Sequence, residues 1–199
     1  MNTPISYSPE TYKKNDGELN STLSNMFADA TYEMSNPVFN MMSGKNIDIV
    51  LLNNGGIRSI ISKGNISEKT AFELMPFENS IVVLELSGLS IIKMIDYLRK
   101  VKLQHPISGL QITLNNDYSV NEVKINGVSI ENEKKYYVAT TDYLLEGGDK
   151  MYFLAETTKT TYINYKMRDI LIDYFKKYDT LKLKSDNRFI RIKWIEKPF

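Results

Sequence analysis

The chain has 199 residues, 42% of them hydrophobic, which is enough for one well-packed core or two small ones. Its 25 Lys and Arg residues nearly balance 24 Asp and Glu residues, so the net charge of +1 gives no reason to expect a nucleic acid or an anionic membrane as partner. No stretch approaches the roughly 18 apolar residues of a membrane span, and the absence of cysteine excludes disulfides, thiolate nucleophiles and cysteine-type zinc sites.

The first half of the chain predicts alternating helices and strands. Residues 1–18 are polar, show no secretion signal, and are expected to form a poorly ordered lead-in. Helical spacing of apolar residues predicts a helix from about 21 to 35 that stops before Pro37. The apolar run 47–52 predicts a strand buried on both faces. There follow a short helix over 67–72 capped by Ser67 and closed by Pro76, a strand over 81–86, and a helix from Gly88 to about 100–102.

Strands dominate the second half. The predicted elements are a strand over 110–114, a hairpin over 123–130 that turns at Asn126-Gly127, a strand over 136–141, a long final helix marked by Ile163 to Tyr174, and a half-exposed strand over 188–195 with Ile190, Ile192 and Trp194 on one face. Without repeats or a linker, residues 1–199 are expected to form a single mixed α/β domain.

The sequence contains few histidine or cysteine side chains that could bind a transition metal or act as a general base. The single histidine, His105, precedes Pro106 and is expected to be a surface loop residue. A di-metal phosphoesterase needs several His, Asp and Asn ligands that converge on two ions. We therefore expect no catalytic residue, no metal site and no cofactor on this chain, which should bind a ligand without transforming it.

Three segments carry candidate binding residues. Asn53 to Arg58 follows a predicted strand, and its two glycines and its arginine can bring backbone and a cation close to a ligand, although a tight turn with a surface arginine would look the same. Phe77 and Tyr143 are each either core residues or platforms for stacking a base. Asp149 directly follows Gly147-Gly148, a place where an ordinary turn residue is also common.

In this order, the segments Asn53–Arg58, Met75–Asn79 and Thr141–Asp149 resemble the C-terminal, substrate-binding domain of the 5'-nucleotidase / UDP-sugar hydrolase family. The resemblance covers roughly residues 20–153 and implies layered α/β/β/α packing. It also implies that Phe77 and Tyr143 hold the base and that Asp149 accepts hydrogen bonds from the ribose. The other implied site residues are Asn53 near the base or ribose, Arg58 toward the phosphate or sugar, Asn79 at the base edge, and Gly109 at a strand start.

The segment Ser24–Ala30 resembles a helix of the same family, in which Asn25 and Asp29 are expected to hold loops together. Two departures concern the phosphate side. The family usually has arginines before this helix, where this chain has Lys13 and Lys14, and lysine cannot form a bidentate fork. Glu78 stands where glycine is common and is expected to narrow the binding cleft or repel phosphate.

The resemblance implies a specificity domain for a nucleoside or nucleotide such as adenosine or AMP. Catalysis would then belong to a metallophosphoesterase domain or subunit outside this chain, with its divalent metal ions, in the periplasm or at the cell surface. Two alternatives stay open from the sequence: a stand-alone nucleoside-binding module, and a protein-interaction domain that no longer binds nucleotides.

Overall fold

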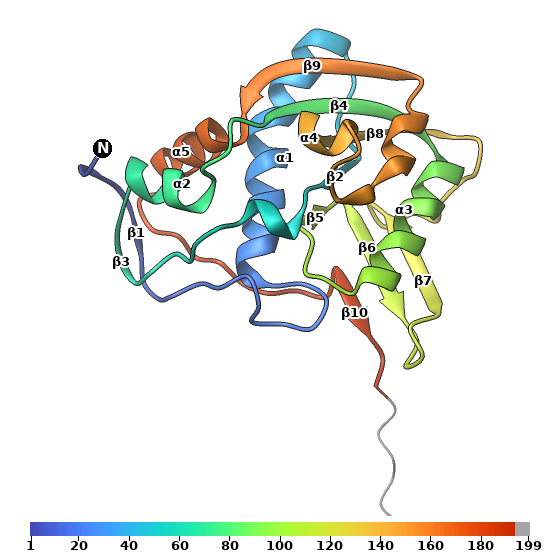
Figure 1. Ribbon diagram of the computed structural model, residues 1–199, viewed down its shortest axis with the longest axis horizontal. Coiled ribbons are helices and arrows are strands. Elements are labelled where there is room, and N and C mark those ends of the chain that lie inside the picture. The colour runs from blue at the N-terminus through green and yellow to red at the C-terminus, as the bar shows by residue number, and fades with distance from the viewer. Residues whose placement is uncertain (194–199) are drawn as a thin grey trace, which may run out of the picture.

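The computed structural model of the chain describes residues 1–193. At its centre is a five-stranded mixed sheet, which in spatial order comprises β5 (Ile107–Ser108), β2 (Ile49–Leu51), β8 (Lys135–Thr141), β4 (Ser80–Ser87) and β9 (Lys159–Lys166) (Figure 1). β2 and β8 are parallel, and the other neighbours in this sheet are antiparallel.

Each face of this sheet has its own hydrophobic core. Val50 and Val83 point into a core shared with α1 (Thr22–Ser43) and α5 (Met167–Lys177). Ile49 and Val82 point into a second core shared with α3 (Gly88–Val101) and a three-stranded sheet. That sheet runs in the order β10 (Phe189–Arg191), β6 (Leu110–Leu114), β7 (Val120–Ile125). The predicted mixed α/β fold with layered packing is confirmed, and the neighbouring residues of β2 face opposite cores as expected for a fully buried strand.

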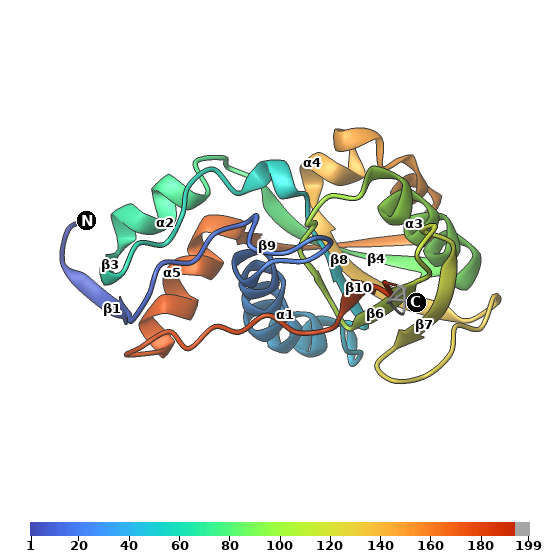
Figure 2. The same cartoon turned by 90° about the horizontal axis from the view of Figure 1, so that it is seen from below.

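The smaller elements lie around these layers. They are the antiparallel pair β1 (Pro4–Ser8) and β3 (Gly64–Ser67), the helices α2 (Glu68–Leu74) and α4 (Asp142–Leu145), and three 3₁₀ turns over Asn54–Gly56, Gly148–Lys150 and Tyr152–Glu156. Figure 2 shows α2, α5, β1 and β3 at one end of the molecule and α3, β6 and β7 at the other. β1 belongs to residues 1–18, the segment that the sequence marks as a lead-in.

Several element boundaries follow local signals. β6 has the predicted bounds, and α3 begins at Gly88 because the Ser87 hydroxyl accepts a hydrogen bond from the Ser90 amide. α2 begins after Ser67 with a reciprocal capping box to Thr70, and it continues to Leu74 rather than ending at Phe72.

The predicted end of the first helix is wrong, because α1 continues through Pro37 to Ser43 and is capped by Gly44 at φ 68°. Proline removes one backbone donor from the helix. Beyond it, Phe39 is only 1% exposed and its ring lies 5.4 Å from that of Tyr137. Burial of this aromatic side chain stabilises the helix past the missing hydrogen bond.

Three predictions for the second half need correction. Ile163 lies in β9, so α5 begins only at Met167. Asn126-Gly127 turns as predicted, with both φ angles positive, but only a single bridge joins Ile125 to Val128, and the main partner of β7 is β6. β10 is shorter than predicted, and its core-facing residue is Phe189, at 1% exposure, whereas Ile192, just past its end, is 45% exposed. Trp194 and Ile195 lie outside the described residues.

Candidate functional site

One cavity of about 290 Å³ gathers side chains from the three segments that the sequence singled out. It lies at the edge of the central sheet where β2 and β8 end and β4 begins, and it is lined from the loops after β2 and β8 and the loop before β4. It contains six of the seven predicted site residues and two glycines of the first segment. Its lining comprises Asn53, Gly55, Gly56, Arg58, Phe77, Asn79, Tyr143 and Asp149.

The loop that follows β2 is tied down from several directions. Its 3₁₀ turn is closed by the Gly56 amide, which donates to the Asn53 carbonyl at 3.1 Å. The Arg58 amide donates to the Leu74 carbonyl at 2.9 Å, which joins the loop to the end of α2. Lys14 donates to the Ile57 carbonyl at 2.7 Å. Arg58 therefore projects into the cavity from a fixed backbone, with its guanidinium carbon 6.0 Å from the centre of the Phe77 ring.

Lys14 lies beside this loop, so the segment before α1 does bring a cation near the cavity. Burial lowers the pKa of Lys14, and the neighbouring positive charge of Arg58 lowers it further. Among the described residues neither cation has a carboxylate within 4.0 Å, as the ion pairs all involve other side chains. This edge of the cavity carries positive charge that an anionic group can neutralise.

His105 supports the same loop from behind, and its prediction as a surface residue is wrong. The side chain is only 1% exposed, and its Nδ1 accepts a hydrogen bond from the Asn54 amide at 3.2 Å. Burial lowers the pKa of His105, which favours the neutral ring that can accept this hydrogen bond. Nothing in the local sequence marks this histidine as buried, because the contact joins residues 51 positions apart.

The second segment presents Phe77 at 42% exposure from a loop that other elements hold. The Met167 amide donates to the Asn79 carbonyl at 2.9 Å, and Glu78 forms ion pairs with Lys166 and Arg168. Hydrogen bonds from Lys166 and then from Arg168 lower the pKa of Glu78 to about 2. The expectation that Glu78 narrows the cleft or repels phosphate is therefore wrong, because its carboxylate is turned toward these two cations and is not part of the cavity lining.

The third segment brings Tyr143, at 42% exposure, together with Asp149. The Tyr143 hydroxyl donates to Oδ1 of Asp149 at 3.2 Å. Gly148 makes this approach possible, since a Cβ there would lie 2.4 Å from Cε1 of the Tyr143 ring. The Ser80 amide donates to the Asp142 carboxylate at 3.1 Å, which fixes the start of α4 against β4. The aromatic ring and the carboxylate are thus held as one unit at the cavity wall.

Gly109 is the predicted site residue that the structure does not bring to this cavity. It lines a different hollow, beside Asn126 and Arg188. Its φ is +73°, and a Cβ there would lie 2.0 Å from the carbonyl oxygen of Asp48. This position needs glycine because two backbone segments meet there.

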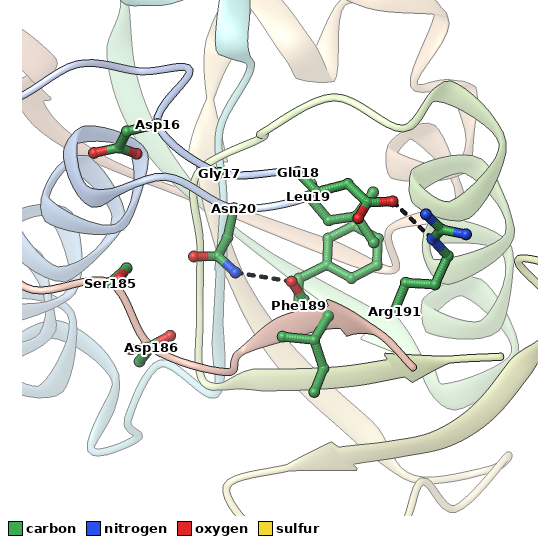
Figure 3. A pocket seen from close by; sticks show the side chains of 10 residues that line it. Asp16, Gly17, Glu18, Leu19, Asn20, Ser185, Asp186, Phe189 and Arg191 are labelled. Carbon is green, nitrogen blue, oxygen red and sulfur yellow. Dashed lines mark hydrogen bonds and ion pairs between the residues drawn. The ribbon is translucent and has the colours of Figure 1, made fainter. Parts of the chain in front are cut away.

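Asn25 and Asp29, which the resemblance predicts to hold loops together, both contact the segments next to α1: Asn25 Nδ2 donates to Asn20 Oδ1 at 3.3 Å, and Asp29 pairs with Arg188, which directly precedes β10. Arg188 donates to both carboxylate oxygens of Asp29, at 2.7 and 2.9 Å. Nearby, Asn20 donates to the Phe189 carbonyl at 2.8 Å and Arg191 pairs with Glu18, around a hollow of about 230 Å³ (Figure 3). These groups satisfy one another and anchor β10, so we assign this hollow a structural role.

Within residues 1–193, no group of three or more His, Asp or Glu side chains is arranged to hold a metal ion. Among the described helices, none combines the length and apolarity that crossing a membrane requires. The cavity instead offers two exposed aromatic rings, one guanidinium, one carboxylate and two carboxamides. The glycines Gly55 and Gly56 also line it, and their adjacency in the sequence was the signal for a close backbone approach.

Comparison with known proteins gives a consistent result. The family model described as "5'-nucleotidase, C-terminal domain" matches residues 4–156. Protein UshA of Escherichia coli is 33% identical over 108 residues, which cover 51% of this chain and 19% of UshA. The cell wall protein Lmo0130 of Listeria monocytogenes is 32% identical over 144 residues, which cover 65% of this chain and 18% of that protein. This chain thus spans about a fifth of the length of these relatives.

A solved structure agrees in fold over the whole chain. The 5'-nucleotidase precursor of Thermus thermophilus superimposes with a TM-score of 0.82 at 22% identity, covering 100% of this chain and 40% of that one. The NAD nucleotidase of Haemophilus influenzae superimposes with a TM-score of 0.71 at 16% identity, covering 96% of this chain and 38% of that one. At these identities the agreement concerns the fold alone.

Proposed function

The chain belongs to the family of 5'-nucleotidase C-terminal domains, and from this membership we propose that it is the nucleoside- and nucleotide-binding specificity domain of a 5'-nucleotidase. The observation that carries the proposal is the single cavity to which three distant segments bring Phe77, Tyr143, Asp149 and Arg58. Such convergence of apolar and polar groups in one hollow is typical of small-molecule sites.

The two aromatic rings bind the nucleobase. Phe77 and Tyr143 are both 42% exposed, so each keeps part of a ring face available at the cavity. Stacking on an aromatic side chain contributes about 1–3 kcal/mol per base and tolerates different bases. Asn79 also lines the cavity, and its carboxamide can donate to or accept from the base edge.

The polar groups bind the rest of the nucleotide. Asp149 accepts hydrogen bonds from the two ribose hydroxyls, for which an acceptor-only carboxylate is suited. Asn53 contacts the base or the ribose. Arg58, supported by the nearby charge of Lys14, attracts the phosphate, and its planar fork can bind two phosphate oxygens at once.

Hydrolysis of the phosphate ester belongs to a metallophosphoesterase domain or subunit that carries the divalent metal ions. This chain binds the nucleoside part of the substrate. The binding energy fixes the position and orientation of the phosphate ester, which lowers the activation free energy of its hydrolysis. By analogy with relatives such as the cell wall protein of Listeria, we assign the assembly to the periplasm or cell surface.

Calorimetric titration with adenosine, AMP and UDP-glucose tests this proposal. We expect adenosine and AMP to bind, and Phe77→Ala or Tyr143→Ala to raise Kd roughly five- to hundredfold. Tyr162→Ala is the matched control, because that ring is 57% exposed on β9 and does not line the cavity. Tighter binding of AMP than of adenosine supports a phosphate contact at the edge of the cavity that Arg58 and Lys14 form, whereas equal binding favours a stand-alone nucleoside-binding module.

Folded protein that gives no heat with any of the three ligands would refute the nucleotide-binding proposal for this chain. The same conclusion would follow if Tyr162→Ala weakened binding as much as Phe77→Ala. A protein-interaction domain would then be the better description.

A further inference from the structure

Asp149 lies in a backbone turn that L-residues adopt reluctantly. Gly147 has φ +94°, Asp149 has φ +51° and Lys150 has φ +60°. Glycine reaches this left-handed region freely, but for Asp149 and Lys150 it is sterically unfavourable. Such a turn keeps its shape only when surrounding groups hold it.

Tyr97 holds this turn from outside the cavity. Its hydroxyl, on α3, donates to the main-chain carbonyl of Asp149 at 2.8 Å. The ring is half-buried and packs between Phe153 and His105, with centroid distances of 5.6 and 5.9 Å. Burial and the nearby charge of Asp149 raise the pKa of Tyr97, which keeps the hydroxyl protonated as a donor. A tyrosine packed in this way has little rotational freedom, so its hydroxyl is a fixed reference point.

Tyr97 also links the two sides of the cavity. Its neighbour His105 accepts a hydrogen bond from the Asn54 amide, in the loop that follows β2. The Asp149 turn and the Asn53–Arg58 loop are therefore both hydrogen-bonded to one pair of packed rings, Tyr97 and His105, behind the cavity. Tyr97 itself does not line the cavity, so any effect on a ligand must pass through the residues that it holds, and among the cavity residues it hydrogen-bonds Asp149.

The side chain of Asp149 is held separately by Tyr143, whose hydroxyl occupies one position on Oδ1. Oδ2 faces the glycine loop, 4.0 Å from where a Cβ of Gly55 would lie. Tyr97 fixes the backbone of Asp149, and Tyr143 fixes its Oδ1. The remaining acceptor positions of the Asp149 carboxylate are therefore held in one place. A carboxylate placed in this way can bind two neighbouring hydroxyls at once, whereas one free to turn binds either singly.

We infer that Tyr97 is a positioning residue which, by holding the main chain of Asp149, sets the preference of the cavity for ribose over 2'-deoxyribose. This inference rests on the proposed nucleoside-binding function and adds to it a specificity determinant outside the contact surface.

The test compares adenosine with 2'-deoxyadenosine by calorimetry in the wild type and in Tyr97→Phe, which removes only the hydroxyl. A hydrogen bond to a charged acceptor predicts a wild-type preference for adenosine of roughly ten- to hundredfold. Tyr97→Phe is expected to reduce this ratio at least threefold, mainly by weakening adenosine. Tyr152→Phe is the matched control, since Tyr152 is 67% exposed beside the same turn and does not line the cavity.

A double-mutant cycle separates positioning from general stability. In an Asp149→Ala background, Tyr97→Phe should leave the adenosine-to-deoxyadenosine ratio unchanged, because the residue through which it acts is absent. The inference is overturned if Tyr97→Phe keeps the wild-type ratio, or weakens both nucleosides equally. Wild-type protein that binds neither nucleoside overturns the proposed function itself, and the inference with it.

Discussion

Replacing Gly109 by alanine tests whether this glycine is a packing residue, as the structure indicates, or a ligand-contacting one, as the family resemblance implies. Gly127→Ala is the matched control. Both glycines have positive φ angles, +73° and +82°, so both substitutions incur a similar conformational strain, about 1–2 kcal/mol. They differ in space, because no atom lies within 4 Å of a Cβ at Gly127.

At Gly109 the new Cβ would lie 2.0 Å from the Asp48 carbonyl oxygen, whereas ordinary contacts begin at 3.4 Å. Asp48 cannot move away easily. Its amide donates to the Tyr137 carbonyl at 2.8 Å, and its carboxylate accepts from the Tyr137 amide at 2.8 Å. Displacing these bonded segments adds about 1–3 kcal/mol, as overpacking of a core does. We therefore expect Gly109→Ala to destabilise the fold by about 2–5 kcal/mol in total.

Urea unfolding gives the free energy of unfolding of each variant, and titration with adenosine under folding conditions gives Kd. Gly109→Ala should unfold at clearly lower urea than Gly127→Ala, and the folded fraction of both should bind adenosine with wild-type affinity. Equal stability of the two variants would refute the packing argument. Normal stability with weakened adenosine binding would restore Gly109 to the binding site.

Three further predictions concern the elements around the cavity. Arg168→Met removes the guanidinium that pairs with Glu78 and lies 4.1 Å from the centre of the Phe72 ring, and so removes a support of the loop that carries Phe77. We expect the Kd for adenosine, measured by calorimetry, to rise severalfold, and an unchanged Kd would show that the Phe77 loop keeps its place without Arg168. Pro37→Ala restores a helical donor at an exposed position and should stabilise the protein by about 1–2 kcal/mol in urea unfolding, and a loss of stability would contradict the continuous helix. Burial lowers the pKa of His105 in the folded state, so below the unfolded pKa of about 6.5 the unfolded chain protonates this histidine first, and the free energy of unfolding should fall as the pH drops below 6.5. His105→Gln should flatten this pH dependence of the free energy of unfolding between pH 7 and 5.5, and an unchanged dependence would exclude His105 as its cause.

The segments that form the cavity were recognisable in the sequence because their signals are local. Asn53 and Arg58 follow a buried strand, Phe77 follows Pro76, and Asp149 follows two glycines. The structure brings all four residues to one cavity, together with Asn79 and Tyr143. That they bind a nucleoside or nucleotide is the proposal that the titrations test.

Local signals also predicted several element boundaries. The Ser67 amide donates to the Thr70 hydroxyl at the start of α2, and the Ser87 hydroxyl accepts from the Ser90 amide at the start of α3. β6 has the predicted bounds. These features depend on residues within a few positions of one another, so a sequence window contains all the groups involved.

Tertiary contacts decided the rest. Glu78 turns away from the cavity because Arg168, 90 positions later, is packed beside it. His105 is buried because α3 and the loop after β2 close around it, and α1 continues past Pro37 because Phe39 has a partner in β8. In each case the free energy comes from groups far apart in the chain. Which polar group is buried, and which glycine meets another backbone, is therefore determined only when the two sheets and their helices have packed together.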